Sequence, residues 1–255
     1  MLTLFSNGFS PFARKVAMAL EYKGLKYQTV DGLARSNHQR LLAVNPRAEV
    51  PVLVDGDITV VNSSDIVAHL DLAYPDRPVY PLDLKARVEA RALERLADSR
   101  VDAILLDCSI WTWAEREDQP PPGIKEAGQR DLDRIFERIE VTLERFAEPL
   151  PFGHLTVAEF AFWPHLAALR AIGFTLDPER FPRLTAWLAA MRRERVCHDD
   201  ARRTAEFMKL LVSHGDDLER HKLFWRGDRI EWLLARGYHD WFFSEIEAGR
   251  TLWPN

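Results

Sequence analysis

One change in the secondary-structure pattern along this 255-residue chain limits the folds that it can adopt. Residues 1–80 alternate strand and helix signals, whereas the chain from Leu84 onward shows helical patterns and no convincing strand. Strands followed by a long run of helices indicate an α/β domain joined to a helical domain. The length of the chain agrees with two domains of ordinary size.

The first 80 residues predict short elements in the order β-α-β-α-β-β-α. Ser10 and Pro11 have the residue types preferred at the N-cap and first position of a helix, and Gly24 marks its end. Asp55-Gly56-Asp57 predicts a hairpin turn between the last two strands. The expected strands are 2–5, 27–30, 50–54 and 58–61, and the later helices are 37–44 and 63–74. Strands this short and this few exclude a doubly wound sheet.

The rest of the chain predicts a helical domain and a distinct C-terminal segment. Helices are expected at 84–113, 129–146, 157–172, 182–194 and 199–213. Thr156 and Glu159 form a capping box, which opens an apolar helix expected at the centre of this domain. Aromatic residues then crowd the end of the chain, among them Trp225, Trp232, Tyr238, Trp241, Phe242, Phe243 and Trp253. We expect these aromatic side chains to pack against another part of the protein. We predict domains at 1–80, 84–213 and 214–255.

Charge and composition exclude several classes of protein. Lys and Arg number 34 against 39 Asp and Glu, a net charge of −5, so the basic surface of a nucleic-acid binder is lacking. No apolar run approaches the roughly 18 residues of a membrane span, and the first ten residues lack the features of a signal peptide. Two cysteines, Cys108 and Cys197, are too few for a disulfide framework or a paired-cysteine zinc site. We expect a soluble, cytoplasmic protein without a metal.

A metal site is also a poor interpretation of Cys197-His198-Asp199-Asp200. Neighbouring residues on a helix point in different directions, so structural or surface roles are favoured for all four.

The loop after the first strand is the strongest candidate site. Ser10-Pro11-Phe12-Ala13 stands where a thioredoxin-type fold carries Cys-Pro-x-Cys. A serine hydroxyl at a helix N-terminus can stabilise a bound thiolate but cannot form a disulfide. A hydrogen bond to a charged group contributes about 1.5–3 kcal/mol, and two units of thiol pKa require about 2.7 kcal/mol. The alternative, that Ser10 only caps the helix, stays open.

Two further motifs are weaker when taken alone. A cis Val50-Pro51 bond would leave the Val50 backbone free to pair with an extended peptide, although base rates favour an ordinary trans proline. The hydroxyls of Ser63 and Ser64, at the start of a helix, could form a pocket for a carboxylate.

Taken together, these motifs and the capping box resemble a cytosolic glutathione transferase over roughly residues 1–210. The resemblance implies a thioredoxin-like domain followed by an all-helical domain, usually in a homodimer. It implies that Val50, before a cis Pro51, binds the glutathione backbone. It also implies that Ser63, with Asn62, holds the γ-glutamyl carboxylate.

The same resemblance assigns activation of the thiol to Ser10, with Ser6 and Asn7 as runners-up. Glutathione is then the co-substrate, and a small hydrophobic electrophile is the second substrate. The alternative function is a non-catalytic binding or regulatory protein of the same fold. A deglutathionylating enzyme is disfavoured because it would carry Cys in place of Ser10.

Two departures from the family pattern bear on glutathione binding. Glu49 precedes Val50 where the family often has Lys or Gln, and Asn62 stands where it often has Glu. The acid at Glu49 could repel the glycyl carboxylate, and Arg35, His38 and Arg40 are the basic residues that could compensate. The electrophile pocket would lie between the domains, and its candidate residues are Phe12, Cys108, Trp111 and Trp113. The two tryptophans fit the core or a dimer interface better than a pocket.

Overall fold

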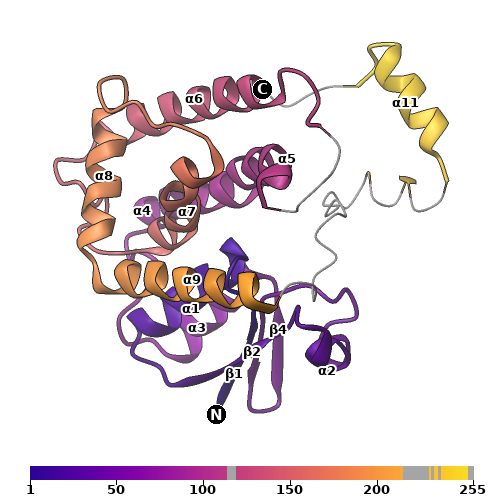
Figure 1. Ribbon diagram of the computed structural model, residues 1–255. Helices are drawn as coiled ribbons and strands as arrows, with labels where there is room; N and C mark the ends of the chain where they lie inside the picture. Colours follow the sequence, from indigo (N-terminus) through magenta and orange to yellow (C-terminus); the bar gives the residue numbers. More distant parts are fainter. Residues whose placement is uncertain (114–118, 215–229, 231–232, 235–236, 252–255) are drawn as a thin grey trace. The chain divides into compact units, whose positions relative to one another are not determined.

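The computed structural model describes residues 1–113, 119–214, 230, 233–234 and 237–251 (Figure 1). The chain divides into two units, Met1–Arg220 and His221–Asn255. Of the aromatic residues named above, Trp225, Trp232 and Trp253 lie outside the described residues, and so does the side chain of Trp113.

A four-stranded mixed sheet forms one layer of the first unit. Its strands are β1 (Leu2–Ser6), β2 (Tyr27–Asp31), β3 (Val52–Asp55) and β4 (Ile58–Val61), in the order β2-β1-β3-β4. β1 runs parallel to β2 and antiparallel to β3, and β3 and β4 form a hairpin. Leu4 of β1 pairs with Leu53 of β3, and both side chains are fully buried. Gly56 turns the hairpin with φ +63°, a conformation that favours glycine.

Three helices accompany this sheet: α1 (Pro11–Tyr22), α2 (His38–Val44) and α3 (Ser63–Ala73), with a 3-10 turn at Arg35–Asn37. α1 begins at the predicted residue because the Ser10 hydroxyl accepts a hydrogen bond from the Ala13 N–H at 3.3 Å. It ends before Gly24, whose φ is +71°. Its buried face includes Val16, Ala19 and Leu20, which explains the helical spacing of these residues.

The helical part of the first unit contains α4 (Leu84–Leu96), a π-helical turn (Ala97–Val101), α5 (Asp102–Trp113), α6 (Ile124–Leu143), α7 (Val157–Ala168), a 3-10 turn (Leu169–Ile172), α8 (Pro182–Arg193) and α9 (Arg195–His214). α6 starts ahead of the predicted residue 129, because Gly123 with φ +78° turns the chain into the helix. α9 also starts early, at Arg195, directly after the extended residue Glu194. The expected change from a mixed sheet to helices is confirmed.

The predicted capping box opens α7, and this helix is central to the core. The Thr156 N–H donates to Glu159 Oε2 at 2.7 Å, and the Thr156 hydroxyl accepts from the Ala158 N–H at 3.3 Å. Trp187 of α8 donates its indole N–H to Glu159 Oε1 at 2.8 Å. Because α7 packs on α1 as well as on α4 and α8, one hydrophobic core joins the sheet layer to the helical part.

The described part of the second unit is mainly helix α11 (His239–Glu247). Its aromatic side chains are substantially exposed: Tyr238 at 49%, Trp241 at 54% and Phe243 at 54%. The packing of the aromatic segment stays a prediction.

Candidate active site

Ser10 connects β1 to the first turn of α1 and is held there by the backbone. Its N–H donates to the Asn7 carbonyl at 3.1 Å, and its carbonyl accepts from the Arg14 N–H at 3.0 Å. The hydroxyl oxygen accepts the capping bond from Ala13 and keeps its proton for another partner, since a hydroxyl both accepts and donates. The two interpretations of Ser10, helix cap and thiolate donor, are therefore compatible.

The side chains of Asn7 and Ser6, the alternatives to Ser10, face the interior of the loop rather than the start of α1. The Asn7 amide donates to Asp31 Oδ1 at 3.2 Å, and its oxygen accepts from the Phe9 N–H at 3.1 Å. Ser6 ends β1 with a nearly buried side chain, and its carbonyl accepts from the Gly32 N–H at 2.9 Å. Both residues line a cavity behind the loop, so Ser10 is the best placed of the three to meet a ligand at the start of α1.

The Val50–Pro51 peptide bond is cis, the isomer that the family resemblance implied. Pro51 is buried, and the register between β1 and β3 begins only at Val52. The backbone N–H and C=O of Val50 therefore lie outside the sheet pairing. Gly32 approaches the Val50 side chain so closely that an added Cβ would lie 2.7 Å from Val50 Cγ1.

The start of α3 has the properties of an anion site. Asn62 adopts φ +66°, and its side chain caps no N–H of the helix; instead its amide donates to Asp65 Oδ2 at 3.2 Å. Ser63 is buried, and within the described residues its hydroxyl has no hydrogen-bond partner. Uncapped N–H groups at a helix N-terminus favour a bound anion.

Ser64 differs from its predicted role. Its hydroxyl donates to Glu94 Oε1 at 2.8 Å and accepts from Lys15 Nζ at 3.3 Å. This contact turns the Ser64 hydroxyl toward a buried ion cluster, so of the two serines only Ser63 is left for a carboxylate.

That ion cluster was not anticipated from the sequence. Lys15 is fully buried, and its Nζ lies 2.9 Å from Glu94 Oε1 and 2.5 Å from Asp98 Oδ2. Burial raises the pKa of the Asp98 carboxyl, although the Lys15 charge opposes this shift. The only sequence signal was a lysine beside Val16 on the apolar face of α1.

Glu49 is paired by a residue that the sequence interpretation overlooked. Arg47 donates from Nε to Glu49 Oε2 at 3.1 Å and from Nη2 to Oε1 at 3.2 Å, and both side chains are about half exposed. His38, by contrast, begins α2 as an exposed residue, and Arg40 donates to the Asn37 side chain at 3.1 Å. The cation observed beside Glu49 is Arg47.

The candidates for the electrophile pocket differ in burial. Phe12 is half-buried in the first turn of α1, and Trp111 is half-buried on α5. Cys108 is a core residue instead, because its thiol donates to the Ile124 carbonyl at 3.5 Å and would touch any side chain at Gly128. Burial raises the pKa of the Cys108 thiol, which disfavours a reactive thiolate.

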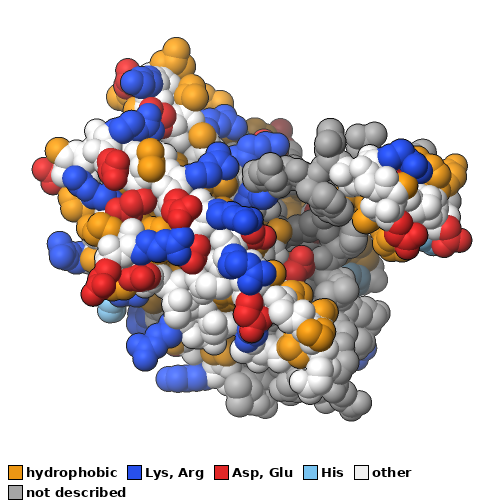
Figure 2. Space-filling view, turned by 90° about the horizontal axis from the view of Figure 1, so that it is seen from above, with side chains coloured by type: hydrophobic (Ala, Val, Ile, Leu, Met, Phe, Trp, Pro, Cys, Tyr) orange, Lys and Arg blue, Asp and Glu red, His pale blue; other side chains and the backbone are white. Residues whose placement is uncertain are grey.

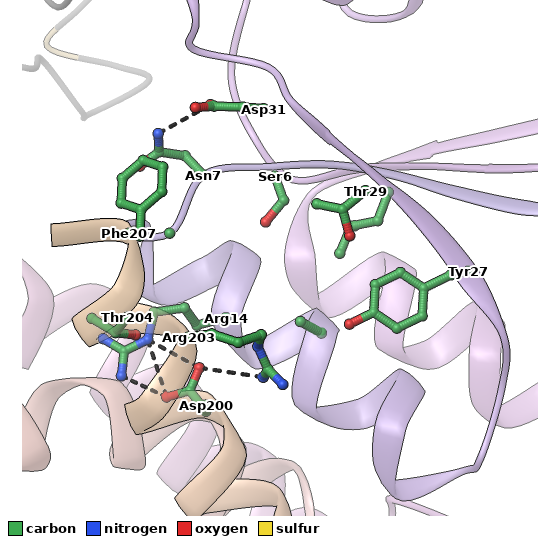
Figure 3. Close-up of a pocket in the computed structure, with 13 residues that line it drawn as sticks. Ser6, Asn7, Arg14, Tyr27, Thr29, Asp31, Asp200, Arg203, Thr204 and Phe207 are labelled. Carbon is green, nitrogen blue, oxygen red and sulfur yellow. Dashed lines mark hydrogen bonds and ion pairs between the residues drawn. The ribbon is translucent and has the colours of Figure 1, made fainter. Parts of the chain in front are cut away.

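A cavity of about 200 Å³ lies behind the loop, between the sheet, α1 and α9 (Figure 3). Ser6, Asn7 and Gly8 contribute from the loop, and the α9 residues that line it include Asp200 and Phe207. Its lining residues do not include Ser10, Val50 or Ser63, so this cavity is separate from the predicted glutathione site.

The described residues contain no cluster of three or more His, Cys, Asp or Glu side chains suited to a metal. In α9, Cys197 and Asp200 are buried while His198 is exposed, so the run of potential ligands does not converge. Within the same described part, no helix has the length and apolar character to cross a membrane. On the face seen in Figure 2, acidic and basic side chains are interspersed.

The fold and the site together define a thioredoxin-like domain joined to an all-helical domain, and comparison with known proteins identifies the family. The model for "Glutathione S-transferase, N-terminal domain" matches residues 4–78, and that for "Glutathione S-transferase, C-terminal domain" matches residues 122–190. The chain belongs to the glutathione S-transferase family. The enzyme class and the two-part fold expected from the sequence are confirmed.

Individual relatives agree with this assignment. Glutathione S-transferase U1 of Arabidopsis thaliana is 30% identical over 183 residues, covering 70% of this chain and 79% of the relative. Glutathione S-transferase omega-1 of Mus musculus is 26% identical over 217 residues, covering 83% and 86%. The crystal structure of a glutathione S-transferase from Rhodospirillum rubrum F11 matches with a TM-score of 0.67 at 26% identity, covering 77% of this chain and 90% of that one.

Proposed function

We propose that this protein binds glutathione, stabilises its thiolate with Ser10 and directs it at a small hydrophobic electrophile. The observation that carries the proposal is the state of Ser10. Its oxygen is engaged in the cap of α1, while its proton is left to donate at the positive end of the helix. No redox cycling is involved, since the loop lacks cysteine.

The energies are sufficient for thiol activation. A hydrogen bond to a charged group contributes about 1.5–3 kcal/mol, and a helix terminus adds about 0.3–1 kcal/mol. Lowering a thiol pKa by two units requires about 2.7 kcal/mol. Holding both substrates together lowers the remaining barrier further.

The rest of the site anchors the tripeptide. The γ-glutamyl carboxylate binds at the start of α3, where Ser63 and the uncapped N–H groups lie. The backbone of Val50 pairs with the extended ligand. Glu49 does not prevent this binding, because Arg47 forms an ion pair with it at 3.1 Å.

The electrophile is apolar and packs near Phe12 and Trp111, the two candidates with described side chains that are not core residues. We place the enzyme in the cytoplasm, since Cys108 and Cys197 are free thiols and disulfides are rare there.

Subunit pairing is part of the same proposal. Exposed apolar side chains occur on β4, on α3 and around the start of α4, where they would be costly on a monomer. They are Ile58, Val61, Leu72, Leu82, Leu84 and Val88. A second copy of the chain covers them in a homodimer, which sedimentation equilibrium would detect as twice the chain mass.

Calorimetric titration with reduced glutathione tests the proposal first. We expect binding in the micromolar to low millimolar range. No heat up to about 10 mM, equivalent to binding weaker than about −3 kcal/mol, would instead support the non-catalytic alternative.

Ser10→Ala and Ser6→Ala then separate the two hydroxyls. We expect Ser10→Ala to raise the pKa of the bound thiol and to lower kcat. The pKa is measured from the ultraviolet absorbance of the thiolate. Ser6→Ala should leave both unchanged, and the reverse result would transfer the role to Ser6.

A further inference from the structure

Helix α9 is bonded to the first turn of α1 through one buried carboxylate. Asp200 is 1% exposed, and it accepts hydrogen bonds from Arg14, from Nη2 at 2.6 Å and from Nε at 3.2 Å to both oxygens. The indole N–H of Trp163 on α7 donates to the same carboxylate at 2.9 Å. Arg14 lies one turn beyond Ser10, and its N–H bonds to the Ser10 carbonyl. Asp200 thus holds the turn that carries Ser10.

A second contact from α9 reaches the other side of Ser10. The Phe207 ring packs edge-on against Phe9, with centroids 5.2 Å apart and planes at 86°. A Cβ on Gly8 would overlap the Phe207 ring, so only glycine lets the helix approach the loop this closely. Phe207 lies seven residues after Asp200, which places both side chains on one face of α9.

Between these two contacts the loop borders a cavity on the side of α9. The cavity of about 200 Å³ separates the backbone around Ser6 and Asn7 from α9 near Thr204 (Figure 3). A segment with a void on one side has fewer packed neighbours to restrain it. Besides the hydrogen bonds of the loop to Asp31 and Gly32, the contacts of Asp200 and Phe207 therefore hold it on the side of α9.

We propose that Asp200 and Phe207 are positioning residues, which hold the Ser10 hydroxyl where it donates to the glutathione sulfur. The inference rests on the proposed function and adds a role for α9, which touches neither Ser10 nor the anchors of the tripeptide in the described contacts. The reason is geometric, since a hydrogen bond is lost when its atoms separate beyond about 3.5 Å. A small shift of the loop removes thiolate stabilisation while Val50 and Ser63 still bind the ligand.

The test uses Asp200→Asn and Phe207→Leu in the full-length chain. Matched controls are Asp199→Asn and Met208→Leu, which alter the next residues on the same helix, where Asp199 pairs with Arg202 and Met208 is exposed. The measurements are the pKa of bound glutathione by thiolate absorbance, KM and kcat, and hydrogen exchange of residues 7–14. Melting temperatures are recorded for every variant.

We expect each positioning variant to raise the pKa of the bound thiol by about one unit, a loss of up to about tenfold in thiolate at neutral pH. kcat should fall in parallel, KM for glutathione should change less than twofold, and exchange in residues 7–14 should quicken without ligand. The controls should match the unsubstituted chain.

Two results overturn the inference, and they are distinguishable. Folded variants that lose melting temperature but keep the thiol pKa and the exchange rates would make α9 merely structural. An unsubstituted chain that does not lower the pKa of glutathione would instead refute the proposed function, and the role for α9 with it. Because Phe207→Leu alters a partly exposed residue, it remains informative if Asp200→Asn fails to fold.

Discussion

Replacing Lys15 by methionine should destabilise the fold strongly and in a pH-dependent way. The side chain is fully buried, with its ammonium group 2.9 Å from Glu94 Oε1 and 2.5 Å from Asp98 Oδ2. Methionine retains much of the apolar stem but leaves two carboxylates without their cation. Breaking a buried ion pair by removing one partner costs about 3–5 kcal/mol. At about 2–4 °C per kcal/mol for a chain of this size, the melting temperature should fall by roughly 6–20 °C.

The pH dependence distinguishes this cause from a simple packing defect. Burial already raises the pKa of Asp98, and loss of the Lys15 charge raises it further. A carboxyl whose pKa is raised by folding stabilises the fold while it is protonated, and that contribution is lost as pH rises through the folded pKa. The penalty of Lys15→Met should therefore be largest near pH 7 and shrink toward about pH 4, the ordinary carboxyl pKa.

Urea unfolding at pH 7 and about pH 5 measures both effects. Lys26→Met, which alters an exposed lysine of the same domain, is the control and should change stability by less than about 0.5 kcal/mol. A loss below about 1 kcal/mol for Lys15→Met, equal at the two pH values, would refute the reasoning.

Further substitutions test three other parts of the structure. Gly8→Ala should destabilise by about 1–3 kcal/mol through its clash with the Phe207 ring, and Phe207→Leu in the same chain should recover part of the loss in chemical unfolding. Glu49→Gln should strengthen glutathione binding a few-fold in low-salt calorimetry, while Arg47→Ala should weaken it by a similar factor; equal affinities would show that this pair is irrelevant to the ligand. Thr156→Ala should cost about 1 kcal/mol in thermal unfolding through loss of the α7 cap, and an unchanged melting temperature would contradict that role.

Local sequence signals predicted the helix caps correctly, because the interactions that form a cap span only a few residues. Ser10 caps α1 through a bond to Ala13, three residues away. The Thr156–Glu159 capping box closes on itself over the same distance. Neighbouring residues determine such structures, so their identities are visible in the sequence.

Some local features were still missed, since composition does not reveal side-chain direction. Arg47 and Glu49 are two residues apart, yet their pairing depends on the loop, where Ala48 adopts φ +55°. The Ser64 hydroxyl turns toward Glu94 rather than toward the open start of α3. The cis Val50–Pro51 bond was not visible from base rates, which favour trans, and was expected only from the family resemblance.

The sequence by itself determined the elements of this protein, their order, the family and the position of Ser10, because periodicity, caps and turns act over short distances. Only the tertiary structure decided which charges are buried together. Lys15 meets Asp98 across 83 residues of sequence, and Arg14 meets Asp200 across 186. No local pattern encodes contacts of this kind, since they exist only after α1 has packed on its partners. That packing also brings α9 into contact with the loop that carries Ser10.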